Sequence, residues 1–327
     1  MCTAINKNTS SSHFFGRNLD FNFNYDESIV IVPNNYPIKF KHLPTMNYHY
    51  PIMGIGIIQD DYPFFFDCIN NQGLAFAGLN FPNNAKFFDV DESKINVAPY
   101  ELPLYFLSQF KTVKQVKEQL KKINIANTPF SNKLPLATLH YIIADKNECI
   151  VIEQTKDGLF VYDNPYGVLT NNPPFTYHIA NLSNYMNITN KEVINRFAPN
   201  LELDIYGKAL GAIGLPGDSS PTSRFVKATF LLNNIRFNND DDFNVNQMLH
   251  ILNNVSTLKG ETLLSDNSEE VTIYSSMYNL DQKQLFIRTY ENNQISKFSL
   301  DSIDFSKNKL IQISIPRKEN YYIIQAD

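Results

Sequence analysis

The first twenty residues, Met1–Asp20, read MCTAINKNTSSSHFFGRNLD. Two short segments, Cys2–Ile5 and His13–Phe15, flank the polar stretch Asn6–Ser12, whose Asn, Thr and Ser residues favour a turn. This pattern predicts a β-hairpin at the start of the chain. The second residue is therefore expected to lie in a sheet rather than in a free terminus.

Working outward, later segments show the periodicity of helices or strands. Ala98–Phe110 and Thr112–Ile123 are predicted helices, and apolar residues recur every three or four positions in the second. The other expected elements are helices over Thr222–Leu232 and Phe243–Val255, a hairpin of Thr138–Ala144 and Cys149–Gln154, and a meander of Val271–Tyr278, Gln284–Tyr290 and Gln294–Phe298. Strands and helices come in blocks, which favours a layered α+β fold. Since no linker or repeat divides the chain, we expect one domain over residues 1–327.

The composition is typical of a globular protein, with 43% hydrophobic and 19% charged residues among 327. A formal net charge of -5 gives no general electrostatic reason to bind nucleic acid or anionic lipid. The first residues lack the basic and apolar segments of a secretory signal, and no apolar run approaches the roughly 20 residues that span a bilayer. We therefore expect a soluble, cytoplasmic protein without membrane insertion.

Cysteine and histidine spacing gives no sign of a metal site. Cys2, Cys68 and Cys149 form no CxxC pair, so neither a disulfide framework nor a cysteine zinc site is expected, and a reducing compartment fits best. The six histidines show no ligand spacing such as an i, i+4 pair. They are His13, His42, His49, His140, His178 and His250.

Cys2 is the first candidate for chemistry. Removal of Met1, which is common before a small residue, would leave a thiol and a free α-amine on Cys2. An α-amino group titrates at about 7.7 to 8.0 and a thiol at about 8.5, so the amine can take the thiol proton near neutral pH. Nucleophile and base would then share one residue. The alternative is an incidental small residue near a frayed terminus.

Arg17 and Asp20 follow the predicted hairpin and can return beside the N-terminus. A guanidinium there would favour a thiolate, and a carboxylate could hold and orient the amine. In isolation, a surface ion pair that contributes little to stability is the commoner arrangement.

Three further polar residues lie in segments rich in glycine and proline. Asn80 lies in GLNFP, Asn171 in GVLTNNPPF and Arg224 in GLPGDSSPTSRF. An asparagine amide can donate to a developing oxyanion, where such a donor is typically worth about 2.7 to 4 kcal/mol. Arg224 would bring a cation to the start of a predicted helix. Turn formation by asparagine and solvation of the helix start are the alternatives.

Taken together, MCTAI, GRNLD, GLNFP, GVLTNNPPF and GLPGDSSPTSRF resemble the choloylglycine hydrolase family over nearly the whole chain. This family comprises conjugated bile salt hydrolases and penicillin V acylases of the N-terminal nucleophile superfamily. The resemblance implies that Cys2 is the nucleophile of a mature chain that starts there and that Asn80 donates to the oxyanion. The full implied catalytic set is Cys2, Arg17, Asp20, Asn80, Asn171 and Arg224.

The same resemblance implies a fold and an assembly. The fold is an αββα sandwich, in which two antiparallel sheets lie between helical layers. The family also implies a homotetramer that needs neither a metal nor an organic cofactor. Its substrate is a small amphipathic molecule with an amide bond.

Both activities of the family cleave an amide between a bulky apolar acyl group and a smaller polar part. Asn80 favours conjugated bile salts, because penicillin V acylases often carry tyrosine there. Apolar residues at positions where family members build the acyl pocket are Leu19, Phe64, Phe65, Phe66, Phe130 and Leu134, and core packing explains several of them equally well. We thus expect a bile salt hydrolase that forms a thioester. A penicillin V acylase and a non-catalytic binding protein of the same fold are the alternatives.

Overall fold

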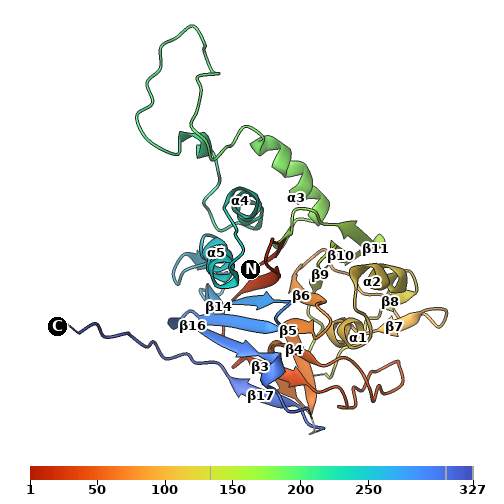
Figure 1. The fold of residues 1–327 in the computed structure, drawn as a ribbon. Coiled ribbons are helices and arrows are strands. Elements are labelled where there is room, and N and C mark those ends of the chain that lie inside the picture. Colours follow the sequence, from red (N-terminus) through yellow and green to blue (C-terminus); the bar gives the residue numbers. More distant parts are fainter. Residues whose placement is uncertain (133, 306–307, 326–327) are drawn as a thin grey trace.

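Two antiparallel sheets form the centre of the molecule, which the computed structural model describes over residues 1–132, 134–305 and 308–325 (Figure 1). Sheet A contains β1 (Cys2–Asn8), β2 (His13–Phe21), β12 (Val168–Leu169), β13 (Thr262–Leu263), β14 (Glu269–Asn279), β15 (Gln284–Thr289) and β16 (Asn292–Ser299). Its strand order is β12-β1-β2-β14-β15-β16, and β13 pairs with β14. The predicted N-terminal hairpin is confirmed as β1 and β2, and β14 to β16 form the predicted meander.

Sheet B lies against sheet A and contains eight strands. They are β3 (Ser28–Val32), β4 (Ile52–Gln59), β5 (Tyr62–Asn70), β6 (Ala75–Asn80), β9 (Leu139–Ala144), β10 (Cys149–Thr155), β11 (Gly158–Asp163) and β17 (Ile311–Ser314). The order β11-β10-β9-β6-β5-β4-β3-β17 includes the predicted hairpin as β9 and β10.

Helices cover the outer faces of both sheets. They are α1 (Leu102–Gln109), α2 (Val113–Leu120), α3 (Phe175–Leu182), α4 (Pro221–Asn234) and α5 (Asp241–Asn253), with short 3₁₀ turns at Pro99–Glu101, Ser183–Tyr185, Leu210–Ala212 and Leu300–Ser302. Helix α4 contacts β1 and β12, and α5 contacts β14 and β2, whereas α1 contacts β4, β5 and β6. The layers are therefore helix, sheet A, sheet B, helix, which confirms the predicted αββα sandwich.

Two apolar cores hold these layers together. The first contains residues of both sheets and of α4 and α5, and Cys2 belongs to it. The second lies between sheet B and the helices α1 and α2. Helix α2 shows how the sequence specifies such packing, because Val113, Val116 and Leu120 are buried on one face while Thr112 caps its start by accepting from the Gln115 N–H at 3.3 Å.

Two of the predicted helices differ from the observed ones by more than two residues at one end. The segment from residue 98 begins with the 3₁₀ turn Pro99–Glu101 before α1 starts. Helix α2 ends at Leu120, because Ile123–Ile125 forms β8, which pairs in parallel with β7 (Ile95–Val97). The β-branched isoleucines fit a strand, and tertiary pairing overrides the helical periodicity there.

Residues 186–215 form a long connection between α3 and α4, which we call the arm. The arm projects beyond the layers of the sandwich (Figure 1). Many of its large apolar side chains are exposed, Phe197 at 92% and the others of this group at 54% or more. The arm's exposed residues of this kind are Met186, Ile194, Phe197, Leu201, Leu203, Ile205, Tyr206 and Ile213. None of the helices in the described ranges has the length and apolar character needed to cross a membrane.

The buried His13 gives the fold a testable dependence on pH. Its Nε2 lies 2.6 Å from Asn6 Oδ1, and burial lowers the pKa of His13 to about 4 against the opposing effect of Asp281 and Asp145. Histidine in the unfolded chain titrates near 6.5, so above that pH the neutral His13 leaves the free energy of unfolding at its full value. As the pH falls from there toward 4, the unfolded chain binds a proton that the folded protein does not, and the free energy of unfolding decreases. We expect this residue to account for about 2 kcal/mol of stability lost between pH 7 and pH 5.

Urea unfolding at both pH values measures this loss. The variant His13→Gln should lose less stability between pH 7 and pH 5 than the unsubstituted chain. The exposed His250 provides the control, because His250→Gln should leave the loss unchanged. Equal losses in all three proteins would contradict the assignment to His13.

Candidate active site

The pairing of β1 with β2 places Cys2 on the inner face of sheet A. Cys2 lies opposite Leu19, and Ala4 lies opposite Arg17. Because side chains alternate along a strand, these four residues share one face. That face points toward sheet B, since Arg17 hydrogen-bonds to the carbonyl oxygens of strands β5 and β6. The Cys2 side chain is consequently buried between the two sheets, with 3% of its surface exposed.

Two buried side chains hold the backbone of Cys2. The Cys2 N–H donates to Asn171 Oδ1 at 2.7 Å, and Arg224 Nη1 donates to the Cys2 carbonyl oxygen. Arg224 also donates from Nη1 to Thr3 Oγ1 at 2.7 Å and from Nη2 to Asn171 Oδ1 at 2.9 Å. We call Asn171 and Arg224 the Cys2 cradle, because together they fix both polar groups of this residue's main chain.

Local structure brings the cradle to Cys2. Strand β12 pairs with β1 and ends two residues before Asn171. The preceding Gly167 has a positive φ of 67°, and a Cβ there would collide with the carbonyl oxygen of Asn6, so only glycine permits this close approach. Arg224 lies in the first turn of α4, where Ser220 caps the helix and the Ser219 carbonyl accepts from Arg224 Nε at 2.9 Å.

Asp20 lies beside the start of the chain. Its main-chain N–H donates to the Met1 carbonyl at 3.0 Å, and its carbonyl oxygen lies 4.0 Å from Cys2 Sγ. The carboxylate accepts from Thr272 Oγ1 at 2.6 Å through Oδ1. The buried Oδ2 has no hydrogen-bond partner among the residues that the structure describes. One oxygen of this carboxylate is therefore available for another donor.

The Met1 ammonium group occupies the same region. It donates to the Asp20 carbonyl at 3.2 Å and pairs with Glu270. Burial lowers the pKa of this amino group, and Arg224 and Arg17 add to the effect, while Cys2 and Asp20 oppose it. An amine in this environment loses its proton more readily than one in water.

Arg17 is fully buried between the sheets. Its Nη1 donates to the carbonyl oxygens of Phe66 at 2.9 Å and Gly78 at 2.7 Å, and its Nε donates to the Asn18 carbonyl at 3.3 Å. Within the described ranges, Nη2 is buried without a partner. Burial alone would lower the pKa of Arg17, but surrounding groups, with Cys2 the foremost, raise it above its ordinary value. The guanidinium thus stays charged near the thiol.

Asn80 completes the group of polar residues predicted from the sequence. It is the last residue of β6, and its carbonyl oxygen accepts from Asn171 Nδ2 at 2.8 Å. Its side chain is half-buried. All six predicted polar positions therefore lie in one connected region, which is made of Cys2, Arg17, Asp20, Asn80, Asn171 and Arg224.

The predicted acyl-pocket residues fall into two groups. Leu19 and Phe66 belong to the same core as Cys2. The Phe66 ring lies 5.0 Å from that of Tyr25, measured between centroids, and Tyr25 in turn contacts Phe21 and Phe23. We call Phe21, Phe23, Tyr25 and Phe66 the aromatic row. Burial raises the pKa of Tyr25 to about 12 and the Cys2 thiol adds to this, so Tyr25, in the middle of the row, lies near Cys2.

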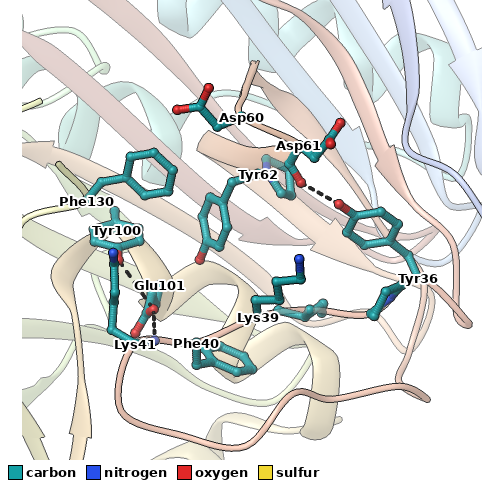
Figure 2. Close-up of a pocket in the computed structure, with 13 residues that line it drawn as sticks. Tyr36, Lys39, Phe40, Lys41, Asp60, Asp61, Tyr62, Tyr100, Glu101 and Phe130 are labelled. Carbon is teal, nitrogen blue, oxygen red and sulfur yellow. Dashed lines mark hydrogen bonds between the residues drawn. The ribbon is translucent and has the colours of Figure 1, made fainter. Parts of the chain in front are cut away.

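Phe64, Phe65 and Phe130 pack instead against the second core, on the other side of sheet B. The rings of Phe64 and Phe130 are 4.8 Å apart and join Tyr62 and Tyr100 in one cluster. Phe130, Tyr62 and Tyr100 line a cavity of about 260 Å³ (Figure 2), and none of the six polar positions is among its lining residues.

Leu134, the last predicted pocket residue, is half-buried and forms an isolated bridge with Ser131, close to Phe130 in the chain.

Several residues of the site carry no local sequence signal. Thr3, Glu270 and Thr272 reach it only because β1 and β14 both lie beside β2. His178 binds the Asn171 carbonyl through Nε2 at 2.9 Å from helix α3. The aromatic spacing of residues 21, 23 and 25, which places rings on alternate positions, is the one pattern that could have revealed Tyr25.

No group of three or more His, Cys, Asp or Glu side chains that could hold a metal ion occurs within residues 1–132, 134–305 and 308–325. The six predicted polar positions supply a buried thiol, two guanidinium groups, one carboxylate and two amides. Such a set suits nucleophilic attack on a carbonyl, followed by stabilisation of negative charge.

An αββα sandwich whose first strand, β1, begins with the buried Cys2 has the fold of the N-terminal nucleophile hydrolases. The chain belongs to the choloylglycine hydrolase family of linear amide C–N hydrolases, whose sequence profile matches residues 2–313. It is thus a hydrolase of linear amide bonds.

Individual relatives agree with this membership. The chain is 41% identical over 99% of its length to a bile salt hydrolase/transferase of Lactiplantibacillus plantarum, which it covers completely. It is 37% identical to the bile salt hydrolase/transferase of Clostridium perfringens, with 95% of each chain covered. These likenesses extend over the whole fold.

Solved structures give the same result for the architecture. A mutant of the conjugated bile acid hydrolase from Clostridium perfringens superposes with a TM-score of 0.91 at 34% identity, covering 99% of this chain and all of the other. The penicillin V acylase of Agrobacterium tumefaciens superposes with a TM-score of 0.76 at 17% identity, covering 96% and 91%. The second match shows a shared fold alone.

The cradle predicts a marked sensitivity to the geometry of Arg224. Lysine keeps the charge but cannot reach four acceptors in the planar arrangement of a guanidinium. Arg224→Lys should therefore leave buried acceptors such as Asn171 Oδ1 and the Cys2 carbonyl short of a donor, and destabilise the fold by roughly 2–4 kcal/mol.

Urea denaturation compares this variant with a matched control. Arg236 is exposed on the connection after α4, so Arg236→Lys should change the unfolding midpoint little. Similar midpoints for both variants would show that the cradle adds nothing to stability.

Proposed function

We propose that this chain hydrolyses conjugated bile salts at the amide bond between the bile acyl group and glycine or taurine. The observation that carries the proposal is the buried Cys2 with its cradle, in a chain that is 41% and 37% identical to two bile salt hydrolase/transferases. Cys2 is the nucleophile in this account, and the reaction passes through a thioester.

Removal of Met1 is the first requirement. It converts the Cys2 peptide N–H into a free amine at the position where Asn171 Oδ1 now accepts a hydrogen bond. The unpartnered Asp20 Oδ2 is suited to accept another hydrogen from this amine. The Cys2 carbonyl remains bound to Arg224, so the new terminus would stay fixed rather than fray. This supports a mature chain that starts at Cys2.

The amine then serves as the base. It takes the thiol proton, the thiolate attacks the amide carbonyl, and the charged Arg17 stabilises the thiolate. Asn80 donates to the oxyanion of the tetrahedral intermediate. When the intermediate collapses, the C–N bond breaks and the Cys2 ammonium returns its proton to the departing glycine or taurine amine.

Water completes the cycle. The free Cys2 amine takes a proton from a water molecule, which attacks the thioester carbonyl. Cleavage of the C–S bond releases the bile acid, and the Cys2 ammonium returns its proton to the leaving thiolate, which restores the thiol and the free amine. In the net reaction, one amide and one water molecule give one carboxylic acid and one amine.

The aromatic row supports a steroid as the acyl group. Leu19 and Phe66 lie in the same core as Cys2, and the row extends from Phe66 to the half-exposed Phe23. A steroid skeleton offers much more apolar surface to such rings than a phenoxyacetyl group does, and ~100 Å² of additional burial corresponds to about 2.5 kcal/mol. The roles of Phe64, Phe65, Phe130 and Leu134 in the acyl pocket stay predictions.

Substitution of Cys2 tests the mechanism. Cys2→Ala should abolish turnover of glycocholate and taurocholate while the unfolding midpoint stays close to that of the unsubstituted protein. Cys68→Ala and Cys149→Ala are controls, since both residues carry a free thiol outside the site and should be dispensable. Full activity of Cys2→Ala would overturn the mechanism.

The same assay separates the two activities of the family. The unsubstituted protein should hydrolyse glycocholate or taurocholate at least about tenfold more efficiently than penicillin V in kcat/KM, which corresponds to about 1.4 kcal/mol in the transition state. A preference for penicillin V would identify an acylase. Binding without turnover of any of the three would indicate a non-catalytic protein of the same fold.

We propose that the working state is a homotetramer in the cytoplasm. The arm supports the assembly. Its large apolar side chains, such as Phe197 and Tyr206, are exposed to water, and a group of exposed apolar side chains is typical of a surface that binds another protein. A second copy of the chain is the partner that explains it, since closed homo-oligomers are the commonest assemblies. Three free cysteines suit a reducing compartment.

Light scattering after size-exclusion chromatography tests this assembly. The protein should elute with four times the 37.6 kDa mass of one chain. The double variant Phe197→Ser with Tyr206→Ser should dissociate toward smaller species. Tyr48→Ser, at an equally exposed aromatic residue outside the arm, should leave the mass unchanged. A monomeric unsubstituted protein would contradict the proposal.

A further inference from the structure

A second buried carboxylate lies close to the site and has no part in the mechanism above. Asp67 of β5 is fully buried between the sheets. Its Oδ1 accepts a hydrogen bond from the Tyr274 hydroxyl, and its Oδ2 accepts from Ser276 Oγ and the Tyr278 hydroxyl, both at 2.8 Å. We call Asp67, Tyr274, Ser276 and Tyr278 the Asp67 clamp. Three hydroxyl donors on one buried carboxylate form a specific arrangement rather than a chance contact.

The clamp joins the two sheets beside Arg17. Tyr274, Ser276 and Tyr278 are alternate residues of β14, so they share the face that points toward sheet B. Ser276 lies opposite Arg17 in the pairing of β14 with β2. Arg17 also joins the two sheets, because it belongs to β2 and its acceptors lie on β5 and β6.

A β-bulge connects Asp67 to Arg17 directly. Asp67 pairs with Ile55 of β4, and the next pair is Phe65 with Gly56, so Phe66 is the extra residue of the bulge. The Phe66 carbonyl accepts from Arg17 Nη1 at 2.9 Å, and its ring belongs to the aromatic row. Bulges commonly redirect groups beside active sites. By fixing Asp67, the clamp fixes the neighbouring carbonyl that holds Arg17.

Charge provides a second connection. Burial raises the pKa of Asp67, while the positive charge of Arg17 and the hydroxyl donors act in the opposite direction. Asp67 in turn helps to keep Arg17 protonated, together with Cys2 and Tyr274. Asp67 and Cys2 therefore both act on the same guanidinium, in a region of low dielectric where charges interact strongly.

We propose that Asp67 is a positioning residue for Arg17, which holds the guanidinium in place and limits how strongly it stabilises the Cys2 thiolate. This inference rests on the proposed role of Cys2 as nucleophile. It predicts that loss of the Asp67 charge leaves more of the Arg17 charge for the thiolate. Cys2 would then react at lower pH than in the unsubstituted protein.

The charged and titratable groups around both residues are few. Those that face Asp67 are Arg17, Cys68, Tyr274 and Tyr278. Those that face Cys2 are Arg17, Asp20, Tyr25 and Arg224, besides the terminal amine. Among the groups named here from the described part of the chain, Arg17 alone belongs to both sets, so we expect Asp67 to act on Cys2 through it.

Alkylation of Cys2 by iodoacetamide measures this effect without any substrate. The rate is followed against pH by the mass of the N-terminal peptide of the full-length mature protein. In Asp67→Asn, the midpoint of the profile should move to lower pH by about 1 unit, because an opposing charge near the guanidinium is gone. Tyr278→Phe removes one hydrogen-bond donor to Asp67, which raises the pKa of Asp67 and leaves a smaller fraction of it charged. This variant should therefore give a smaller shift in the same direction.

Asp145→Asn is the matched control. Asp145 is also a buried carboxylate that accepts hydrogen bonds, from the N–H groups of Val113, Asn147 and Glu148, and lies in the β9–β10 turn. A merely structural effect of losing a buried acid would appear in Asp145→Asn as well, whereas the proposal predicts an unchanged midpoint there.

Midpoints that stay unchanged or rise in Asp67→Asn and Tyr278→Phe would overturn the inference. Should Asp67→Asn fail to fold, Tyr278→Phe decides alone. This failure is distinguishable from a failure of the proposed function, which would appear as turnover retained by Cys2→Ala whatever the alkylation profiles show.

Discussion

The hydrogen bond from Arg224 to the carbonyl oxygen of Cys2 is the contact on which the site depends. A residue so close to the end of a chain normally frays, because little holds it. Here Arg224 binds its carbonyl and Asn171 binds its nitrogen, so residue 2 is as fixed as the middle of a strand. Removal of Met1 would leave both contacts in place. The fold can therefore present a terminal amine and a thiol with defined geometry.

The polar residues around Cys2 come from several separate parts of the chain. Asn171 arrives through the short strand β12, and Arg224 through the start of α4. Arg17 and Asp20 come from β2, and Asn80 from the end of β6 in the opposite sheet. A sandwich of two sheets suits this purpose, because buried polar groups from both sheets can meet in a dry interior where hydrogen bonds and charges have their full effect.

The sequence predicted some parts of this structure much better than others. The N-terminal hairpin and the meander were predictable, because polar turn segments separate short β-prone runs. Strands β3 to β6 were not assigned, since runs such as SIVIV are buried on both faces and lack alternation. Helix α2 was predicted too long, because the periodic Ile123 belongs to strand β8. The local sequence pattern does not predict the correct element where pairing with a distant strand determines it.

The six polar positions were named from motifs and lie together in the structure, yet no motif indicated how they connect. Thr272 on Asp20 and Ser276 on Asp67 follow only from the register of β14. The aromatic residues show the same limit. Phe64, Phe65 and Phe66 are adjacent in sequence, but only Phe66 packs in the core of Cys2, because a bulge in β5 redirects it. Sequence alone does not reveal such a bulge.

The central claim is that Cys2, as the first residue of the mature chain, carries the acyl group during turnover. Acid quenching of the working enzyme with glycocholate, followed by mass analysis of its peptides, tests this directly. The account predicts an N-terminal peptide that begins at Cys2 and gains the mass of the bile acyl group on that residue. Acylation of any other residue, or an active enzyme that retains Met1, would contradict it.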